Sequence, residues 1–153
     1  MSNWIDDVEP MTLKGQIAVP YTWWVGETGS RFLKTIRDEG KFLATRCNRC
    51  DAVYVPPRKN CGRCFAPLDQ WVEVGHQGVV TAFSVVRVDH PQHPVQSPFA
   101  YALIQLDGAS VSITHLVTRD IHKLANGVRV EARFKETAQR TGHILDIDHF
   151  QII

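Results

Sequence analysis

The sequence lacks the features of a membrane-spanning protein, of a secreted protein and of a protein with a large basic surface. None of its apolar runs approaches the ~20 residues that span a bilayer. Residues 1–7 are acidic and lack the basic-then-apolar order of a signal peptide, which predicts a cytoplasmic protein. The 17 Lys and Arg are balanced by 16 Asp and Glu, giving a net charge of +1, so a polycationic nucleic-acid-binding surface is not expected.

The motifs of stand-alone catalysis are also missing. There is no G-x-S-x-G elbow, no glycine-rich phosphate loop and no H-E-x-x-H. Only His90 and His93, of seven scattered histidines, lie close together in sequence, and we interpret their Pro-rich segment as a solvated or interface loop, with a second metal site as the alternative. Asp146 and Asp148 are expected on one solvent-exposed strand face. We predict that the chain is not catalytic alone.

All four cysteines fall in two C-x₂-C pairs with ten residues between them. The pairs are Cys47 with Cys50, and Cys61 with Cys64. This spacing predicts a tetrahedral site for one structural Zn²⁺ per chain, with rubredoxin-type iron as the alternative. Four thiolates leave no open position for water and no free thiol as a nucleophile. The site carries a formal charge of −2, which nearby basic residues offset: Arg46, Arg49, Arg58, Lys59 and Arg63.

The apolar pattern predicts a mainly β protein in three parts. Residues 1–45 are expected to form an N-terminal arm and a helix at 28–40, capped by Thr28 or Ser30 and ended by Gly40. Residues 46–70 are expected to form a rubredoxin-like zinc ribbon. Residues 71–153 show the period-two alternation of strands and predict a five-stranded OB-fold barrel, with a sandwich as the alternative. The expected strands are 71–74, 78–88, 99–106, 111–117, 128–134 and 143–152, with one helical turn at 119–125.

The arm carries three large aromatic residues, Tyr21, Trp23 and Trp24, within four positions. Exposed aromatic surface is costly in water, at about 25 cal/mol per Å². We therefore expect these side chains to dock either on the chain's own core or on a partner subunit. Phe32 and Ile36 lie on one face of the predicted helix and add to the apolar surface that needs cover.

The order of these motifs resembles a known family. Residues 40–50, ending in the first Cys pair, are followed by Tyr-Val-Pro-Pro at 54–57, by Cys-Gly-Arg-Cys at 61–64 and by the segment 98–108. Over roughly residues 20–153 this arrangement is similar to the zinc-ribbon and OB-fold proteins once called domain of unknown function 35. One departure is that Asp51 and Phe65 follow the two Cys pairs, where the family often has glycine.

The resemblance implies a function. Members of the family accompany thiolase-superfamily enzymes, among them acetyl-CoA acetyltransferases, sterol side-chain aldolases, acylphloroglucinol acyltransferases and benzoylsuccinyl-CoA thiolases. The resemblance implies that this chain is a non-catalytic accessory subunit of an enzyme in acyl-CoA metabolism. The chain would stabilise a thiolase-like partner and could line the partner's CoA or acyl channel. The partner would supply the catalytic Cys and His residues and bind most of the acyl-CoA. Since thiolases are two-fold dimers, an α₂β₂ complex is expected.

The residues expected to contact the partner or CoA come from the arm, the helix, the ribbon and the His-Pro loop. They are Trp23, Trp24, Phe32, Ile36, Arg49, Arg58, Lys59, Arg63, His90 and His93. The alternative function is that of a single-stranded nucleic-acid-binding OB protein with a structural zinc ribbon. Such a barrel interleaves aromatic residues with Lys and Arg. Residues 71–153 carry a net charge of −1 and only two lysines, Lys123 and Lys135, which disfavours this alternative.

Overall fold

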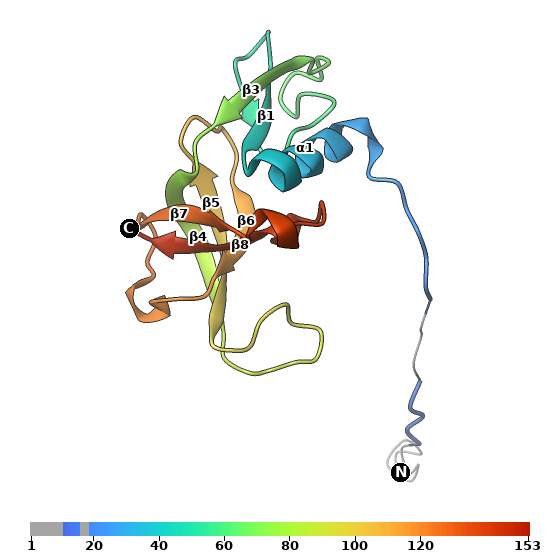
Figure 1. Cartoon of the computed structure of the whole chain (residues 1–153), viewed down its shortest axis with the longest axis vertical. Helices are drawn as coiled ribbons and strands as arrows, with labels where there is room; N and C mark the ends of the chain where they lie inside the picture. The colour runs from blue at the N-terminus through green and yellow to red at the C-terminus, as the bar shows by residue number, and fades with distance from the viewer. Residues whose placement is uncertain (1–10, 16–18) are drawn as a thin grey trace, which may run out of the picture.

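The computed structural model describes residues 11–15 and 19–153. The acidic start at residues 1–7, on which the cytoplasmic prediction depends, lies outside the described residues. The described chain forms one α-helix, α1 (Gly26–Glu39), a three-stranded sheet and a closed five-stranded barrel (Figure 1). The sheet strands are β1 (Phe42–Arg46), β2 (Val53–Tyr54) and β3 (Gln70–Val74). The barrel strands are β4 (Gln77–Val86), β5 (Phe99–Leu106), β6 (Ile113–Val117), β7 (Arg129–Phe134) and β8 (Ile147–Ile152).

Helix α1 begins earlier than the sequence predicts. Val25 occupies the N-cap position and no side chain accepts a hydrogen bond there, so the predicted caps at Thr28 and Ser30 are wrong. The end of the helix is as predicted: Gly40 has φ 64°, and its N–H donates to the Ile36 carbonyl at 3.1 Å. Glycine adopts the left-handed conformation at this position with less strain than any other residue.

The small sheet has the order β2-β1-β3. Strand β3 pairs with β1 along its whole length, from Val74 opposite Phe42 to Gln70 opposite Arg46. Residues 71–74, predicted as a barrel strand, therefore belong to this small sheet, and its central strand β1 was not predicted from the sequence. Alternation identifies a strand but does not identify its neighbour in the sheet.

The barrel has the order β4-β5-β6-β8-β7, which confirms the prediction of a five-stranded OB-fold-like barrel. Strand β4 pairs with β5 over most of its length but with β7 only at Gln77–Val79. Strands β6 and β8 are parallel and meet through Val117 and Phe150. At Gly78 a Cβ atom would overlap the backbone carbonyl of Gln105 on β5, so the close approach of these strands requires glycine.

Most barrel elements lie close to their predicted limits. Strand β5 has the predicted bounds, and the turn predicted at 119–125 contains the 3-10 helix η1 (Ile121–Lys123). Two further 3-10 helices are η2 (Thr137–Gln139) and η3 (Ile144–Asp146). Because η3 occupies its first residues, the strand predicted at 143–152 begins only at Ile147. Asp146 is therefore not on an exposed strand face, and its side chain is buried.

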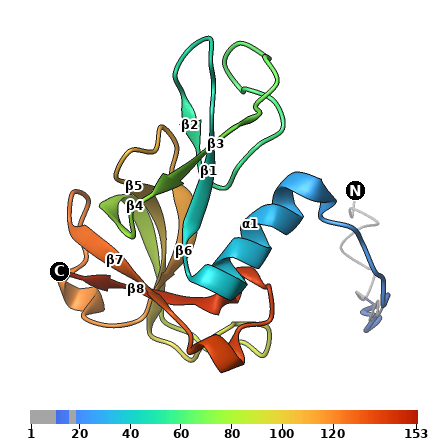
Figure 2. The same ribbon diagram turned by 45° about the horizontal axis from the view of Figure 1, so that its top comes forward.

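One apolar core joins the parts. A cluster of buried residues runs from α1 through β1 and β3 into the barrel interior, and Phe32, Phe42, Val74, Val80 and Phe150 belong to it. Figure 2 shows α1 lying beside β1, with the two loops of the ribbon at the end of the molecule away from the barrel. Phe32 and Ile36 are 3% and 0% exposed, so the expectation that they face a partner is wrong.

The described part of the arm does not pack on this core. Tyr21, Trp23 and Trp24 are 77%, 68% and 77% exposed. Figure 1 shows residues 19–25 leading away from the helix and the body of the molecule. Of the two alternatives for these aromatic residues, docking on the chain's own core is not what the structure shows.

Candidate metal centre and its surface

The four cysteines lie in two loops with the same backbone hydrogen bonds. In the first loop the Cys47 N–H donates to the Ala52 carbonyl at 2.9 Å, and the Asp51 N–H donates to the Cys47 carbonyl at 2.9 Å. In the second, the Cys61 N–H donates to the Ala66 carbonyl at 2.8 Å, and the Phe65 N–H donates to the Cys61 carbonyl at 3.0 Å. The loops therefore form two equivalent turns. Each turn contributes two cysteine sulfurs, and the four sulfurs lie together between the turns.

Each turn depends on one residue in the left-handed region. Asp51 has φ 59° and Phe65 has φ 57°, and these are the two positions that follow the Cys pairs. The turn geometry is kept without glycine at either position. A side chain in this conformation costs about 1–2 kcal/mol.

The sulfur positions fit a tetrahedral metal. All four Sγ atoms lie within 4.8 Å of one another. The Cys47–Cys64, Cys50–Cys61 and Cys50–Cys64 Sγ distances are 3.4, 3.5 and 3.9 Å. A Zn–S bond of about 2.3 Å gives a tetrahedral edge of about 3.8 Å. The four cysteines are unpaired thiols, and their separations suit a shared Zn²⁺.

Tyr54, which the sequence analysis did not single out, hydrogen-bonds to one of the ligands. Its hydroxyl lies 3.3 Å from Cys61 Sγ and accepts the Gly62 N–H at 3.1 Å. The hydroxyl proton is therefore free to point at the Cys61 sulfur. The Arg63 N–H donates to the same sulfur at 3.4 Å. The Tyr54 hydrogen bond, followed by the Cys64 and Arg63 N–H groups, lowers the pKa of Cys61 to about 5 against the opposing effect of burial.

The other thiols divide in the same way. Burial raises the pKa of Cys47, but the N–H groups of Arg49 and Cys50 outweigh it, and the pKa is lowered. The Ala52 N–H favours the Cys50 thiolate, but the hydrogen bond to Cys61 and burial raise the Cys50 pKa to about 12. One thiolate in each loop is thus stabilised before any metal binds, and a bound cation would stabilise all four.

The basic residues of the ribbon lie on its surface. Arg46 pairs with Asp51 at 3.1 Å. Within the described residues the other four make no salt bridge: Arg49, Arg58, Lys59 and Arg63. The Arg58 guanidinium lies over the Tyr54 ring at 5.3 Å from its centre. These cations surround a site of formal charge −2 and remain exposed to solvent.

His90 and His93 lie in the loop between β4 and β5. Their ring centres are 5.5 Å apart, and the His93 ring packs edge-on against Phe99 at 5.4 Å. Over residues 11–15 and 19–153, the cysteine quartet is the only cluster of three or more ligand groups that could hold a metal. The alternative of a second metal site in this loop therefore has no support from the described residues.

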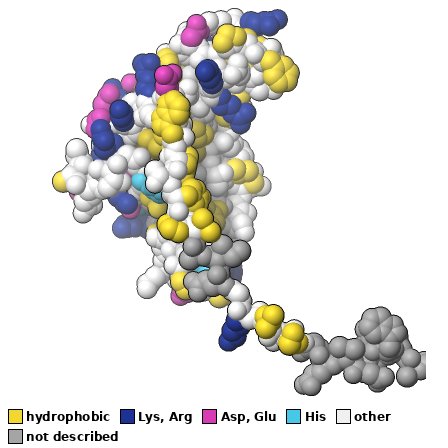
Figure 3. Space-filling model, turned by 90° about the vertical axis from the view of Figure 1, so that its right-hand side faces the viewer, with side chains coloured by type: hydrophobic (Ala, Val, Ile, Leu, Met, Phe, Trp, Pro, Cys, Tyr) yellow, Lys and Arg dark blue, Asp and Glu magenta, His cyan; other side chains and the backbone are white. Residues whose placement is uncertain are grey.

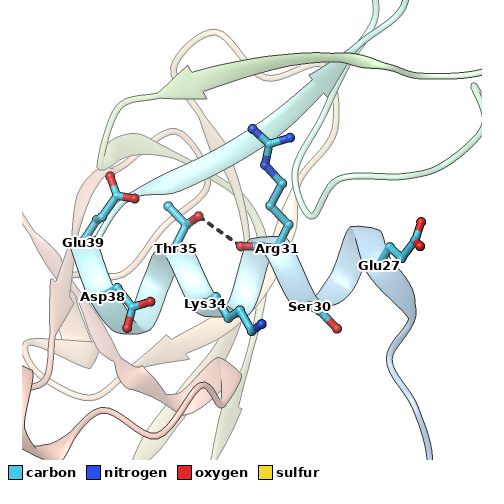
Figure 4. Close-up of a pocket in the computed structure, with 7 residues that line it drawn as sticks. All are labelled: Glu27, Ser30, Arg31, Lys34, Thr35, Asp38 and Glu39. Carbon is cyan, nitrogen blue, oxygen red and sulfur yellow. Dashed lines mark hydrogen bonds between the residues drawn. The ribbon is translucent and has the colours of Figure 1, made fainter.

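The hollow along α1 is polar. Seven polar side chains of the helix line it (Figure 4): Glu27, Ser30, Arg31, Lys34, Thr35, Asp38 and Glu39. The Thr35 hydroxyl donates to the Arg31 carbonyl at 3.0 Å, and the Arg31 guanidinium lies 4.3 Å from the centre of the Trp71 ring. The structure shows no hydrogen bond from Ser30, Lys34 or Thr35 to a carboxylate of this hollow, so it pairs none of these possible nucleophiles with a base. No helix in the described residues has the length and apolar character to cross a membrane.

Comparison with known proteins identifies both parts of the chain. The model of the rubredoxin-like zinc ribbon domain of ChsH2 matches residues 35–69, and that of the C-terminal OB-fold domain of ChsH2 matches residues 71–135. A DUF35 domain-containing scaffold protein from Methanocaldococcus jannaschii is 26% identical over 106 residues, which cover 69% of this chain and 75% of that protein.

Two solved structures share the fold. A DUF35-family protein of unknown function from Sulfolobus solfataricus superposes with a TM-score of 0.59 at 19% identity, covering 70% of this chain and 78% of that one. The structure described as the Ltp2-ChsH2(DUF35) aldolase gives 0.60 at 20% identity, covering 84% and 93%. The ribbon and barrel models match adjacent segments of the chain, and the four cysteine sulfurs lie close enough together to share a metal ion. This chain therefore belongs to the DUF35 family of ChsH2-type zinc-ribbon and OB-fold proteins.

Proposed function

We propose that this chain is the non-catalytic accessory subunit of a thiolase-like enzyme that acts on acyl-CoA. The observation that carries the proposal is the similarity to the Ltp2-ChsH2(DUF35) aldolase, in which a chain of this fold is described together with Ltp2. The relative from Methanocaldococcus jannaschii is described as a scaffold protein, which supports the same kind of role. We propose cytoplasm as its compartment.

The metal centre supports a scaffolding role. Cys47, Cys50, Cys61 and Cys64 would hold one Zn²⁺, which supplies folding energy to the ribbon when bound. Four sulfur ligands leave no position for a substrate or a water molecule on the ion. The residues of this chain would then stabilise the partner by binding to its surface. The partner would supply the nucleophile and the base for the thioester chemistry.

The exposed apolar arm is the first proposed contact with the partner. Trp23 and Trp24 remain mostly exposed on the described chain, and aromatic side chains of this kind dominate the energy of many protein interfaces. The unpaired cations Arg49, Arg58, Lys59 and Arg63 are proposed contacts either with the partner or with the phosphates of its CoA. The loop with His90 and His93 is a third, weaker candidate.

Co-expression with the thiolase-like protein encoded in the same genome tests the proposal. We expect a stable complex of α₂β₂ mass, thioester chemistry from the complex, and none from this chain alone. Replacing Trp23 and Trp24 together by alanine is expected to weaken the complex at least tenfold without changing the thermal unfolding temperature of the free chain. Turnover by the isolated chain, or a thiolase-like protein that ignores it in gel filtration at micromolar concentration, would contradict the proposal.

A further inference from the structure

The second loop of the ribbon carries an apolar side chain that the fold does not use. Phe65 is 80% exposed, and it packs against no other aromatic ring and no guanidinium of the described residues. Its backbone is in the left-handed region at φ 57°, where glycine would be free of strain. The position therefore keeps a large apolar group at a cost to the stability of the free chain.

The equivalent position in the first loop shows what the turn itself requires. Asp51 has φ 59° and makes the same backbone hydrogen bond as Phe65, so neither turn depends on the side chain at this position. Asp51 at least pairs with Arg46 at 3.1 Å. Phe65 has no such partner, and strained backbone that its own surroundings do not explain points to a functional contact.

Charge around Phe65 indicates what it would contact. Arg63 lies two residues before it, and Arg49 occupies the equivalent place in the first loop, whose Cys47 Sγ lies 3.4 Å from the Sγ of Cys64 in the second loop. Both cations are exposed and make no salt bridge within the described residues. At the ribbon end of the molecule, hydrophobic and basic side chains share the surface (Figure 3).

We propose that Phe65 is an anchor that inserts into an apolar pocket on the catalytic partner, with acidic residues at the pocket rim to receive Arg49 and Arg63. This inference rests on the proposed function and assigns it a surface. We call Phe65, Arg49 and Arg63 the ribbon tip. A buried aromatic anchor with basic residues at its rim is a combination that concentrates binding energy at protein interfaces. Single-stranded nucleic acid is the competing ligand class for an exposed ring beside arginines, but it calls for several stacking rings along a basic groove.

The test separates the anchor from the fold because one substitution is expected to move stability and binding in opposite directions. In the full-length chain, Phe65→Gly removes the strain and the ring together. We expect the unfolding temperature of the free chain to rise by about 2–4 °C. We expect its affinity for the co-expressed thiolase-like subunit, measured by titration calorimetry, to fall at least tenfold.

The matched control is Asp51→Gly at the equivalent turn position, which is expected to raise the unfolding temperature as well and to leave affinity within about twofold. Arg63→Glu is a second probe of the ribbon tip that leaves the backbone unstrained. It should weaken binding while Arg119→Glu, at an exposed cation between β6 and η1 that lies outside every proposed contact surface, does not. Weakening by Arg63→Glu should also diminish at high salt.

The outcomes are distinct. If the unmodified chain binds the subunit and Phe65→Gly binds equally well, the anchor is overturned and the proposed function stands. If Phe65→Gly lowers the unfolding temperature along with the affinity, Phe65 is a structural residue and the anchor is overturned. If the unmodified chain binds no thiolase-like subunit, both proposals fail. If a fluorescent single-stranded oligonucleotide binds at physiological salt and the Phe65→Gly variant loses that binding, the partner pocket is replaced by nucleic acid.

Discussion

At the scale of single residues, Tyr54 connects the metal centre to the ribbon fold. Its hydroxyl accepts the Gly62 N–H and faces Cys61 Sγ, while its ring is 3% exposed and lies beneath the Arg58 guanidinium. A phenylalanine would fill the same space but would leave a backbone donor and a buried sulfur without this partner. Such losses cost about 1–3 kcal/mol.

We therefore expect Tyr54→Phe to lower the free energy of unfolding by about 1–3 kcal/mol while the chain still carries one zinc. Urea denaturation and metal analysis of the same samples provide the measurement. The control is Tyr21→Phe, because the Tyr21 hydroxyl is on an exposed ring. An unfolding free energy unchanged in Tyr54→Phe would show that the hydroxyl contributes nothing to the ribbon.

Asp146 is the second residue whose role comes from its hydrogen bonds. Its carboxylate is 1% exposed and accepts the N–H groups of Thr141, Gly142 and His143 at 3.0, 2.6 and 3.2 Å. Burial raises the pKa of Asp146, but the three N–H donors outweigh it and the pKa is lowered. The ionised form is thus favoured in the folded protein.

A lowered pKa in the folded state gives stability that is present above the unfolded pKa of about 3.9 and is lost as the pH falls through the folded value. We expect the free energy of unfolding to decline below about pH 4, and Asp146→Asn to remove part of that decline. At pH 7 this variant should be less stable by about 1–3 kcal/mol, because its amide N–H₂ faces donors. Asp148→Asn, at a side chain 52% exposed, is the control. Equal pH profiles for Asp146→Asn and the unmodified chain would contradict the assignment.

These two residues also show where sequence reasoning stops. The spacing of the cysteines was sufficient to predict that the four sulfurs come together, because four thiolates at these intervals have few other uses in a chain of this kind. Nothing in the spacing of Asp146 and Asp148 distinguished a strand from the turn that Gly142 allows at φ 86°. Tyr54 lay in an apolar stretch between the Cys pairs, and its role depends on a contact with Cys61 that forms only in the folded ribbon.

At the scale of elements, the barrel depends on the close pairing of β4 with β5. Gly78 lies opposite Leu106, and its missing side chain is what lets the Gln105 carbonyl approach. The alternation of residues 78–88 and 99–106 was sufficient to predict both strands, but not that Gly78 is required there. Likewise, the pattern Trp-Val-Glu-Val identified β3 without showing that it pairs with β1.

We expect Gly78→Ala to destabilise the chain by about 1–3 kcal/mol, since backbone atoms of β5 must move to admit the methyl group. Gly75→Ala is the control, because an added Cβ there meets no atom within 4 Å. Thermal unfolding followed by circular dichroism compares the two. Similar unfolding temperatures for both variants would show that β4 and β5 can move apart to admit the methyl group without a loss of stability.

At the scale of the whole molecule, the residues that the structure describes form two apolar clusters. The larger joins α1, the base of the small sheet and the barrel, and the smaller surrounds Cys47 and Cys61 with Tyr54 and Leu68. The larger cluster contains none of the four cysteines. Loss of the metal should therefore act first on the outer end of the ribbon.

We expect Cys61→Ser to lose the bound zinc and to make residues 47–68 susceptible to protease while the barrel stays resistant, because a structural zinc site contributes folding energy directly. Excess chelator should reproduce this pattern in the unmodified chain. Metal analysis and mass spectrometry of the fragments check both. Asn48→Ser, which replaces a residue of the same loop that is not a metal ligand, is the control. Retention of one zinc by Cys61→Ser would contradict the ligand assignment.

The short connection between β3 and β4 has a consequence for assembly. Only Gly75 and His76 separate these strands, and on the other side Ser110, in the β5–β6 loop, exchanges two hydrogen bonds with Val53 at 2.8 and 2.9 Å. The small sheet is thereby tethered to the barrel at two points far apart in sequence. A partner that binds the ribbon therefore also fixes the orientation of the barrel. Two binding surfaces at opposite ends of this chain would keep their relative orientation when the complex forms.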